Sequence, residues 1–254
     1  MNVRAYALEA KYELVKTIRL PAFVIPAVGF PLMFYTLFGL LMGSGSSRPG
    51  GISASSYLLA TYGAFGVIGI SLFALGVGVA TERAQGWLAV KRVSPMPVSA
   101  YFFGKYATTV AFALLLAALL ALLGVSFGHV HLTAAQWMSW LVVEVLGGLP
   151  FCAMGLSIGY LVGPNSAPAI MNAIYLPMSF LSGLFIPAFL LPKVLQNVAT
   201  FLPPYHLGQL ALKAAGVLPA DGAWKNAAAL IGFGVAFGIF AVGAYRRDEG
   251  KTYG

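Results

Sequence analysis

Charge is scarce in this sequence. Acidic and basic side chains together make up 9% of its 254 residues, with 7 Asp and Glu against 15 Lys and Arg. A soluble domain carries about 25% charged residues. Together with the mean hydropathy of +0.86, this deficit excludes an ordinary water-soluble globule and a disordered chain. We therefore expect the lipid bilayer to be the environment of the protein.

Cysteine and clustered titratable groups are also lacking. The one cysteine, Cys152, lies in an apolar run, which excludes an internal disulfide and a cysteine-based metal site. His129 and His131 form an H-x-H pair without a nearby Cys, Asp or Glu. A solvated loop is favoured there over a metal site.

No stretch matches the phosphate-binding pattern G-x-x-x-x-G-K-[ST], whose backbone N–H groups hold nucleotide phosphates. The chain is therefore expected to have no catalytic residue and no bound cofactor of its own. Energy for uphill transport would come from a partner chain or an ion gradient.

Six apolar runs are long enough to cross a bilayer, because a helix needs about 20 residues to span about 30 Å of hydrocarbon. The predicted spans are 21–42, 57–80, 101–127, 137–162, 167–189 and 227–245. Prolines interrupt the stretch 190–226, which is predicted to form short re-entrant helices on the outer side. Small residues at close spacing predict helix-packing faces, namely Gly155, Gly159 and Gly163, and again Gly234 and Gly238.

Residues 1–19 are predicted to form an amphipathic helix in the membrane interface. Its apolar face would contain Val3, Ala7, Ala10, Leu14 and Ile18. The expected fold class is an all-α membrane protein with a single transmembrane domain over residues 1–254.

The positions of the cations predict the orientation. With the N-terminus inside, most Lys and Arg fall in cytoplasmic segments, namely Arg4, Lys11, Lys16, Arg19, Arg83, Lys91, Arg92, Lys105, Arg246, Arg247 and Lys251. The outer segments hold Arg48, Lys193, Lys213 and Lys225. Because positive charge stays on the cytoplasmic side, both termini are predicted to be cytoplasmic. The net charge of +8 then reflects topology, and no nucleic-acid partner is expected.

The cytoplasmic segment between the second and third predicted spans opens with charged residues and ends in a Pro-x-Pro turn. We expect a short helix over residues 82–93. One of its sides would be apolar and would contain Trp87, Leu88, Val90 and Val93. Glu82, Arg83, Lys91 and Arg92 would face water or another protein. The alternative is a solvated loop that only anchors the topology.

This segment resembles the E-R-x-x-G-[TS] … P-[ML] … G-K stretch of ABC-2 type transporter permeases. The matching residues are Glu82, Arg83, Gly86, Pro95, Gly104 and Lys105. The resemblance covers the whole chain, because 182–187, 191–192 and 201–206 look like the family's fifth-span exit and outer hairpin. Trp87 stands where the family usually has Thr or Ser, which places the fine contacts with a partner in doubt.

The resemblance implies the membrane subunit of an ABC exporter in a prokaryotic plasma membrane. Two such subunits, expected to be identical, would pair and dock onto two copies of a separate ATPase that binds ATP and Mg²⁺. Residues 82–93 would be the coupling helix. The expected contacts with the ATPase are Glu82, Arg83, Gly86, Trp87, Leu88, Lys91 and Arg92.

The resemblance also implies that the first and fifth spans of paired subunits line the substrate route. The candidate residues are Phe34, Tyr35, Phe38, Asn172, Tyr175 and Phe180. Packing in the core is the alternative role for any single aromatic residue among them. Because these candidate residues are mostly apolar, the route favours an amphipathic, drug-like or lipid-like substrate.

Glu144 is the one acidic residue inside a predicted span. Its carboxyl group would either be hydrogen-bonded at a helix contact or belong to a substrate path or gate. The second interpretation supports an alternative function, a proton- or ion-coupled secondary transporter that uses Glu144. An integral membrane enzyme is disfavoured, because acids, bases and metal ligands do not cluster.

Overall fold

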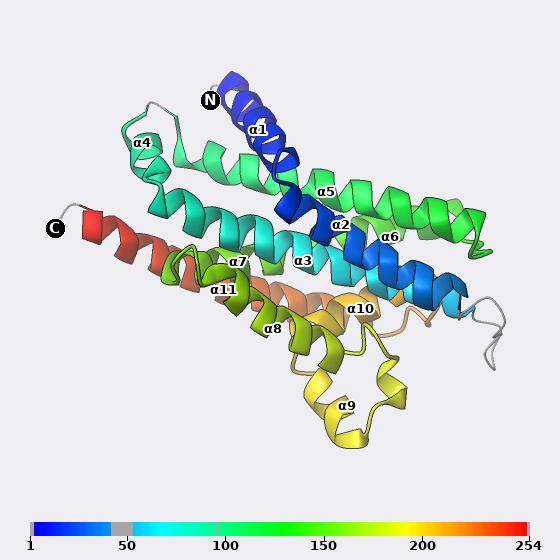
Figure 1. The fold of residues 1–254 in the computed structure, drawn as a ribbon. Helices are drawn as coiled ribbons and strands as arrows, with labels where there is room; N and C mark the ends of the chain where they lie inside the picture. The colour runs from blue at the N-terminus through cyan, green and yellow to red at the C-terminus, as the bar shows by residue number, and fades with distance from the viewer. Residues whose placement is uncertain (1–2, 42–52, 95, 253–254) are drawn as a thin grey trace.

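The protein is a bundle of helices, shown in Figure 1 by a computed structural model that describes residues 3–41, 53–94 and 96–252. The side chains of Arg92 and of 249–252 lie outside the described part, as do Arg48, the loop around it and Pro95. In chain order the elements are α1 (Val3–Ile18), α2 (Pro21–Phe34), the π-helix η1 (Tyr35–Leu41), α3 (Ala54–Ala84), α4 (Trp87–Val93), α5 (Val98–Ser126), α6 (Ala134–Gly147), α7 (Leu149–Leu161), α8 (Ala167–Leu181), the 3₁₀-helix η2 (Ala188–Leu190), α9 (Lys193–Ala199), α10 (Pro203–Ala214) and α11 (Ala223–Thr252). The prediction of an all-helical fold is confirmed.

Five segments of the described chain are long and apolar enough to cross a membrane. They are Pro21–Leu41, Ala54–Ala84, Val98–Ser126, Ala134–Leu161 and Ala223–Asp248. The sixth predicted span, 167–189, is not a continuous helix. Helix α8 has 15 residues, about 22 Å of rise, and the chain turns at Gly183, whose φ of +80° suits glycine. Helix length and composition therefore give five membrane-crossing segments in the described residues, one fewer than the six predicted from the sequence.

Local sequence signals explain where the long helices begin and break. The Ser53 side chain accepts a hydrogen bond from the backbone N–H of Ser56 and caps α3. Thr133 and Gln136 form a capping box that opens α6. The predicted fourth span is divided into α6 and α7 at Gly148, directly before the Leu149–Pro150 start of α7. This break follows from the missing backbone N–H of proline.

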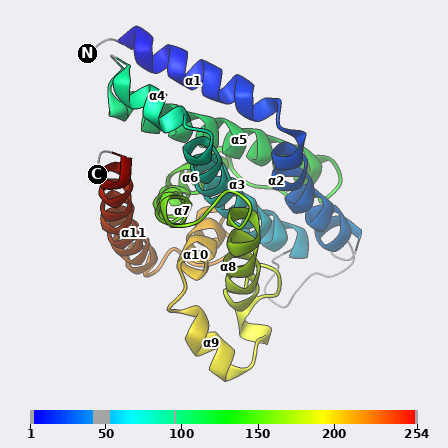
Figure 2. The same cartoon turned by 60° about the vertical axis from the view of Figure 1, so that its left-hand side comes forward.

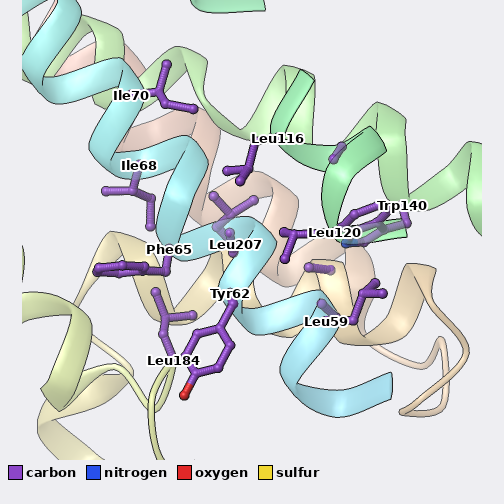
Figure 3. Close-up of a cluster of buried hydrophobic side chains, with 14 of the residues drawn as sticks. Leu59, Tyr62, Phe65, Ile68, Ile70, Leu116, Leu120, Trp140, Leu184 and Leu207 are labelled. Carbon is purple, nitrogen blue, oxygen red and sulfur yellow. The ribbon is translucent and has the colours of Figure 1, made fainter. Parts of the chain in front are cut away.

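Helix α3 is the centre of the bundle. Its buried side chains, including Leu59, Phe65 and Ile68, pack against Leu116 and Leu120 of α5 and against Leu207 of α10 (Figure 3). Figure 2 shows α3 surrounded by its neighbours, with α7 and α10 beside it. Burial on all sides explains why α3 lacks an amphipathic pattern.

Two glycines of α7 bring this helix against α3. A Cβ atom at Gly155 would lie 2.9 Å from the carbonyl oxygen of Leu72, and one at Gly159 would lie 2.5 Å from that of Gly76. Only glycine permits such an approach of the two backbones. The predicted helix-packing role is confirmed for Gly155 and Gly159. A Cβ atom at Gly238 would have no described neighbour within 4 Å, and one at Gly163 would have only Ser166 Oγ, at 3.9 Å.

Helix α1 forms where the sequence predicts a helix. Helices α1 and α5 lie against each other, and Glu13 and Thr17 of α1 are buried. Val3 and Ile18 of its predicted apolar face are exposed, as that face would be on a helix lying in the membrane interface. The interfacial position of this helix stays a prediction.

Ion pairs and hydrogen bonds bring several helix ends together. Arg83 at the end of α3 donates hydrogen bonds to the carbonyl oxygens of Tyr160 and Val162, at the end of α7. It also lies 3.6 Å from Asp248 in α11. Figure 1 accordingly shows both chain ends toward the same end of the bundle.

The segment 190–226, predicted as re-entrant helices, contains α9 and α10. Helix α10 contacts α11, α3 and α6, and Leu207, Ala211 and Leu212 are buried in the core. Helix α9 projects from the side of the bundle (Figure 2). Short helices are therefore present, and α10 is an integral part of the bundle.

Candidate functional site

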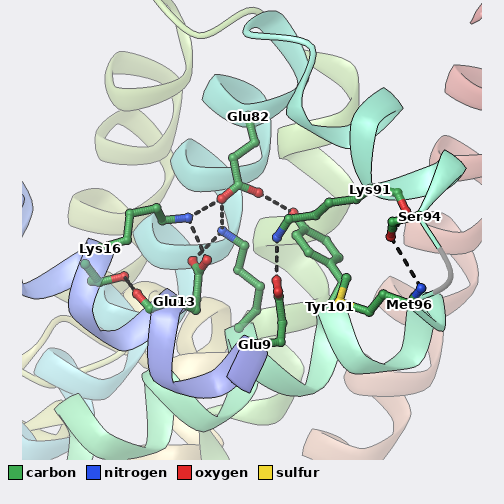
Figure 4. Close-up of polar contacts among 10 residues, drawn as sticks. Glu9, Glu13, Lys16, Glu82, Lys91, Ser94, Met96 and Tyr101 are labelled. Atoms are coloured by element: carbon green, nitrogen blue, oxygen red, sulfur yellow. Dashed lines mark hydrogen bonds and ion pairs between the residues drawn. The ribbon is translucent and has the colours of Figure 1, made fainter. Parts of the chain in front are cut away.

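The end of the bundle that carries α1 and α4 holds a cluster of buried charges (Figure 4). The Lys105 ammonium donates to Glu82 Oε1 and Glu13 Oε1, at 2.7 Å each. Lys16 donates to Glu13 Oε2 at 2.6 Å and also pairs with Glu82. We call Glu13, Lys16, Glu82 and Lys105 the charge quartet. It joins α1, α3 and α5.

Three members of the quartet are shielded from water, whereas the side chain of Lys16 is 43% exposed. The two carboxylates of the quartet balance its two ammonium groups. The side chain of Lys105 is 2% exposed and that of Glu13 is 6% exposed. Burial alone would lower the pKa of Lys16, but the carboxylates of Glu82 and Glu13 raise it above its ordinary value of 10.5. Lys16 is thus held in its charged form at neutral pH.

Glu82 and Arg83, predicted to face water or a partner protein, both turn inward. The Tyr101 hydroxyl donates a further hydrogen bond of 2.7 Å to Glu82. Arg83 binds the last carbonyl groups of α7, which have no partner within their own helix. The predicted exposure of this pair is therefore wrong, because buried partners on other helices satisfy both charges.

The predicted helix 82–93 is divided in two. Helix α3 continues to Ala84, and α4 begins at Trp87 after Gly86, whose φ of +77° is left-handed. The backbone of Gly86 thus makes the turn that redirects the chain. Glu82 and Arg83 belong to the last turn of α3, so the sequence correctly locates a helix here but begins it too early.

The exposed face of α4 is apolar. Trp87, Val90 and Val93 are 55%, 58% and 81% exposed, whereas Leu88 is buried. Lys91 points back toward the bundle, where it pairs with Glu9 of α1 and its Nζ lies 4.5 Å from the centre of the Tyr101 ring. The prediction placed Lys91 outward, and this is wrong. The side chain of Arg92 lies outside the described part of the chain.

Four of the predicted route aromatics gather around Phe185. The ring centres of Phe34 and Phe180 lie 5.3 Å and 4.2 Å from that of Phe185, and Phe38 lies 6.2 Å from Phe34. Tyr175 joins the cluster through Phe65, 4.7 Å away. We call the surface formed by Phe34, Phe38, Phe180 and Phe185 the aromatic face.

The aromatic face is open to its surroundings and uncharged. Phe38 and Phe180 are exposed and Phe34 is half-buried. Asn172 is exposed two helical turns before Phe180. The segments 21–41 and 167–181, which supply most of this surface, contain no Asp, Glu, Lys or Arg.

The side chains of Tyr35 and Tyr175, both predicted route residues, lie inside the bundle. Tyr35 is fully buried, and a Cβ atom at Gly128 would meet its hydroxyl at 2.8 Å. The hydroxyl of Tyr175 donates a 2.8 Å hydrogen bond to the carbonyl oxygen of Phe65. Tyr35 therefore packs in the core, and Tyr175 connects α8 to α3.

Glu144 is 1% exposed and lies apart from the aromatic face. A Cβ atom at Gly63 would lie 2.7 Å from its Oε1 and 2.7 Å from the Trp140 ring. Within the described part of the chain, neither carboxyl oxygen has a hydrogen-bond partner. The side chain is thus enclosed between α6 and α3.

Sequence reasoning did not identify Glu13, Lys16 and Lys105 as site residues. A lysine at position 105, inside a predicted span, was the available signal, because a buried cation needs carboxylate partners.

His129 and His131 are exposed, and the searched part of the chain has no group of three or more His, Cys, Asp or Glu that could hold a metal.

Comparison with known proteins agrees with this architecture. Residues 47–242 match the family model described as ABC-2 family transporter protein. The chain is also 27% identical, over 237 residues, to Putative transport permease YvfS of Bacillus subtilis (strain 168), an alignment that covers 93% of this chain and 95% of that protein. The family match includes the central helices and the segment that contains α4. The chain therefore belongs to the ABC-2 transporter family and is a multi-pass membrane transport permease.

Proposed function

We propose that the chain is the permease subunit of an ABC exporter, in which two permease chains form the substrate pathway and a separate ATPase supplies the energy. ATP and Mg²⁺ would bind to that ATPase. Family membership supports transport, and the exposed apolar face of α4 supports the partnership.

That face of α4 is the observation that carries the proposal. Trp87, Val90 and Val93 follow one another at intervals of three residues, so they share one side of the short helix. They lie beyond the apolar core of α3, where water would otherwise meet them. Exposed apolar groups next to a polar surface mark a contact with another protein or with the membrane. The ATPase would occupy this surface.

The aromatic face is the proposed substrate route, shared by two permease chains. Phe38 and Phe180 are exposed beside Asn172, which offers an amide for hydrogen bonding. Because 21–41 and 167–181 have no charged side chain, this surface favours an amphipathic, drug-like or lipid-like substrate over a strongly charged one.

The end with α1 and α4 is proposed to lie in the cytoplasm of a prokaryotic cell, as the positive-inside rule indicates. Helix α7 ends there beside Arg83, and α11 reaches the same end at Asp248. The chain must therefore return to the far end between them. Helix α8 with the segment to Leu190 is proposed to make this sixth crossing.

The proposal is tested by purifying the tagged chain in mild detergent from its native membrane, with mass spectrometry of the bound proteins and an ATPase assay. Val93→Asp should lose the ATPase. Val194→Asp, at a similarly exposed position in α9, should keep it and is the matched control. Recovery of no P-loop ATPase with the unaltered chain would refute the exporter proposal, and normal recovery with Val93→Asp would refute the assignment of α4.

One observation favours a second candidate function, an ion- or proton-coupled transporter. Glu144 is buried in a membrane-crossing segment, and neither of its oxygens has a hydrogen-bond partner in the described structure. Buried ionisable groups in spans often serve ion pathways. Transport that persists without any ATPase and stops when the proton gradient is dissipated would support this function over the first.

A further inference from the structure

The charge quartet connects α1 to both α3 and α5. Lys105 of α5 and Glu82 of α3 form a buried pair inside the bundle, with an Nζ–Oε1 distance of 2.7 Å. Glu13 and Lys16 of α1 each contact this pair with a group of opposite charge. Helix α1 is thus fixed at a particular register on two other helices.

The backbone at this contact is built for close approach. A Cβ atom at Gly104 would lie 2.9 Å from Glu9 Cγ and 3.2 Å from the Glu9 carbonyl carbon. One at Gly78 would lie 3.3 Å from Lys105 Nζ. These glycines leave room for α1 beside α5 and for the ammonium group beside α3.

Helix α4 is connected to the helices of the charge quartet through Lys91. Lys91 of α4 pairs with Glu9 of α1 and stands over the ring of Tyr101, and the Tyr101 hydroxyl donates to Glu82. A displacement of α4 would therefore act on α1 through Lys91 and on α5 through Tyr101. The quartet would carry the same displacement into α3.

Stability alone is a weak explanation for such a cluster. Removing charges from water is costly, and well-packed apolar groups often stabilise a fold as well as a buried ion pair does. Ion pairs differ from apolar contacts in fixing partner and register, because each group must meet one of opposite charge. The quartet is therefore better explained by positioning than by net stabilisation.

We propose that the charge quartet docks α1 on the buried Lys105–Glu82 pair, so that α1, α3, α4 and α5 move as one unit when the ATPase acts on α4. Glu13 and Lys16 are positioning residues in this device. The inference rests on the proposed function of α4 as the ATPase contact.

The test uses the full permease–ATPase complex in lipid nanodiscs, with Cys152→Ser as the background. Glu13→Gln/Lys16→Met removes both α1 members of the quartet, leaves net charge unchanged and preserves the Lys105–Glu82 pair. Lys16→Arg retains the charge, and Lys11→Met removes an exposed cation from the same helix. These two variants are the matched controls.

Two measurements separate the docking of α1 on the bundle from the transmission of movement to the far end of the bundle. Cysteines at Tyr6 and Ser99, whose hydroxyl oxygens lie 2.6 Å apart, report the docking of α1 on α5 by their yield of cross-linking with a short bis-maleimide. A cysteine at Val194 in α9 reports, by its rate of maleimide labelling, how ATP with vanadate changes the far end of the bundle.

We expect the double variant to assemble and hydrolyse ATP, while its cross-linking yield and the ATP-dependent change in labelling both fall about fivefold or more. Both controls should match the parent complex. Unchanged labelling in the double variant would overturn the inference, whether or not cross-linking falls. If the double variant does not assemble, Lys16→Met, which leaves Lys105 between both carboxylates, is measured in the same way. A parent complex without ATPase activity is a different result, and refutes the proposed function instead.

Discussion

The two ends of the helical bundle are held together by different interactions. At the end with α1 and α4, buried charges of opposite sign connect helices that are distant in sequence. At the other end, side chains form hydrogen bonds with nearby backbone and amide groups, and Lys213 donates one to the backbone carbonyl oxygen of Asp221. His206 Nε2 lies 3.0 Å from the carbonyl oxygen of Thr200, and its Nδ1 lies 2.9 Å from Asn226 Oδ1.

This difference matches what each end is proposed to do. Ion pairs fix partner and register, which suits an end that receives a displacement from an ATPase. The far end combines hydrogen bonds to backbone and amide groups with the exposed apolar surface of α9, whose contacts are less directional. The contrast indicates that the charged end is the stiffer of the two. Substitutions at each end measure how much its interactions contribute to the stability of the fold.

The largest effect is expected at Glu82. Glu82→Ala leaves Lys16 and Lys105 with Glu13 as their one remaining quartet carboxylate, so it should destabilise the fold by about 3–5 kcal/mol. The measurement is the shift in thermal unfolding of the purified chain in detergent. Asp221→Ala, at an exposed position of the far end, should change stability by less than about 0.5 kcal/mol. Similar losses for both variants would remove the contrast between the ends.

A smaller loss is expected at Tyr175, between the two ends. Tyr175→Phe removes the hydrogen bond to the Phe65 carbonyl but keeps the ring stacked on Phe65. Hydrogen bonds between membrane helices contribute about 0.6 kcal/mol on average, and we expect a destabilisation of that size in the same unfolding assay. A loss as large as that of Glu82→Ala would show that neutral contacts matter as much as buried charge.

Glu144→Gln should have almost no effect. An isosteric, uncharged amide fits where neither carboxyl oxygen has a described hydrogen-bond partner, so stability should change by less than about 0.5 kcal/mol and ATP-driven transport should persist. Loss of transport with an intact fold would instead identify Glu144 as the coupling group of a gradient-driven carrier.

The contribution of Lys16 to stability should be lost under alkaline conditions. Because the pKa of Lys16 is raised above 10.5 in the folded protein, its contribution is fully present at neutral pH and is lost as pH rises through the folded pKa. The difference in thermal stability between the parent and Lys16→Met should therefore stay constant from neutral pH to about 10 and decrease above this range. A difference that already decreases near neutral pH would contradict the charged state assigned to Lys16.

Part of this architecture could be predicted because it depends on local sequence. Apolar runs of about 20 residues predict helices that cross a bilayer. Five of the six predicted spans appear as long helical segments close to their expected ranges, and two of these five are interrupted, one by the π-helix and one by the α6–α7 break. The helix α4 and the close approach of Gly155 and Gly159 were also predicted. Each of these features is encoded within a few turns of chain.

Other features depend on partners that are distant in sequence. The inward direction of Glu82 requires Lys16 and Lys105, which lie 66 and 23 residues away, and nothing in the segment itself indicates them. The burial of Glu13 in α1 likewise depends on Lys105, which lies 92 residues away.

The sequence by itself determined that the protein is a helical membrane protein of the transporter class, because hydropathy, the length of apolar runs and the coupling-segment motif are properties of the chain alone. Only the tertiary structure decided which charges are satisfied internally and which surfaces remain open. Charge pairing and burial depend on which helices become neighbours, and that is settled when the bundle packs around α3.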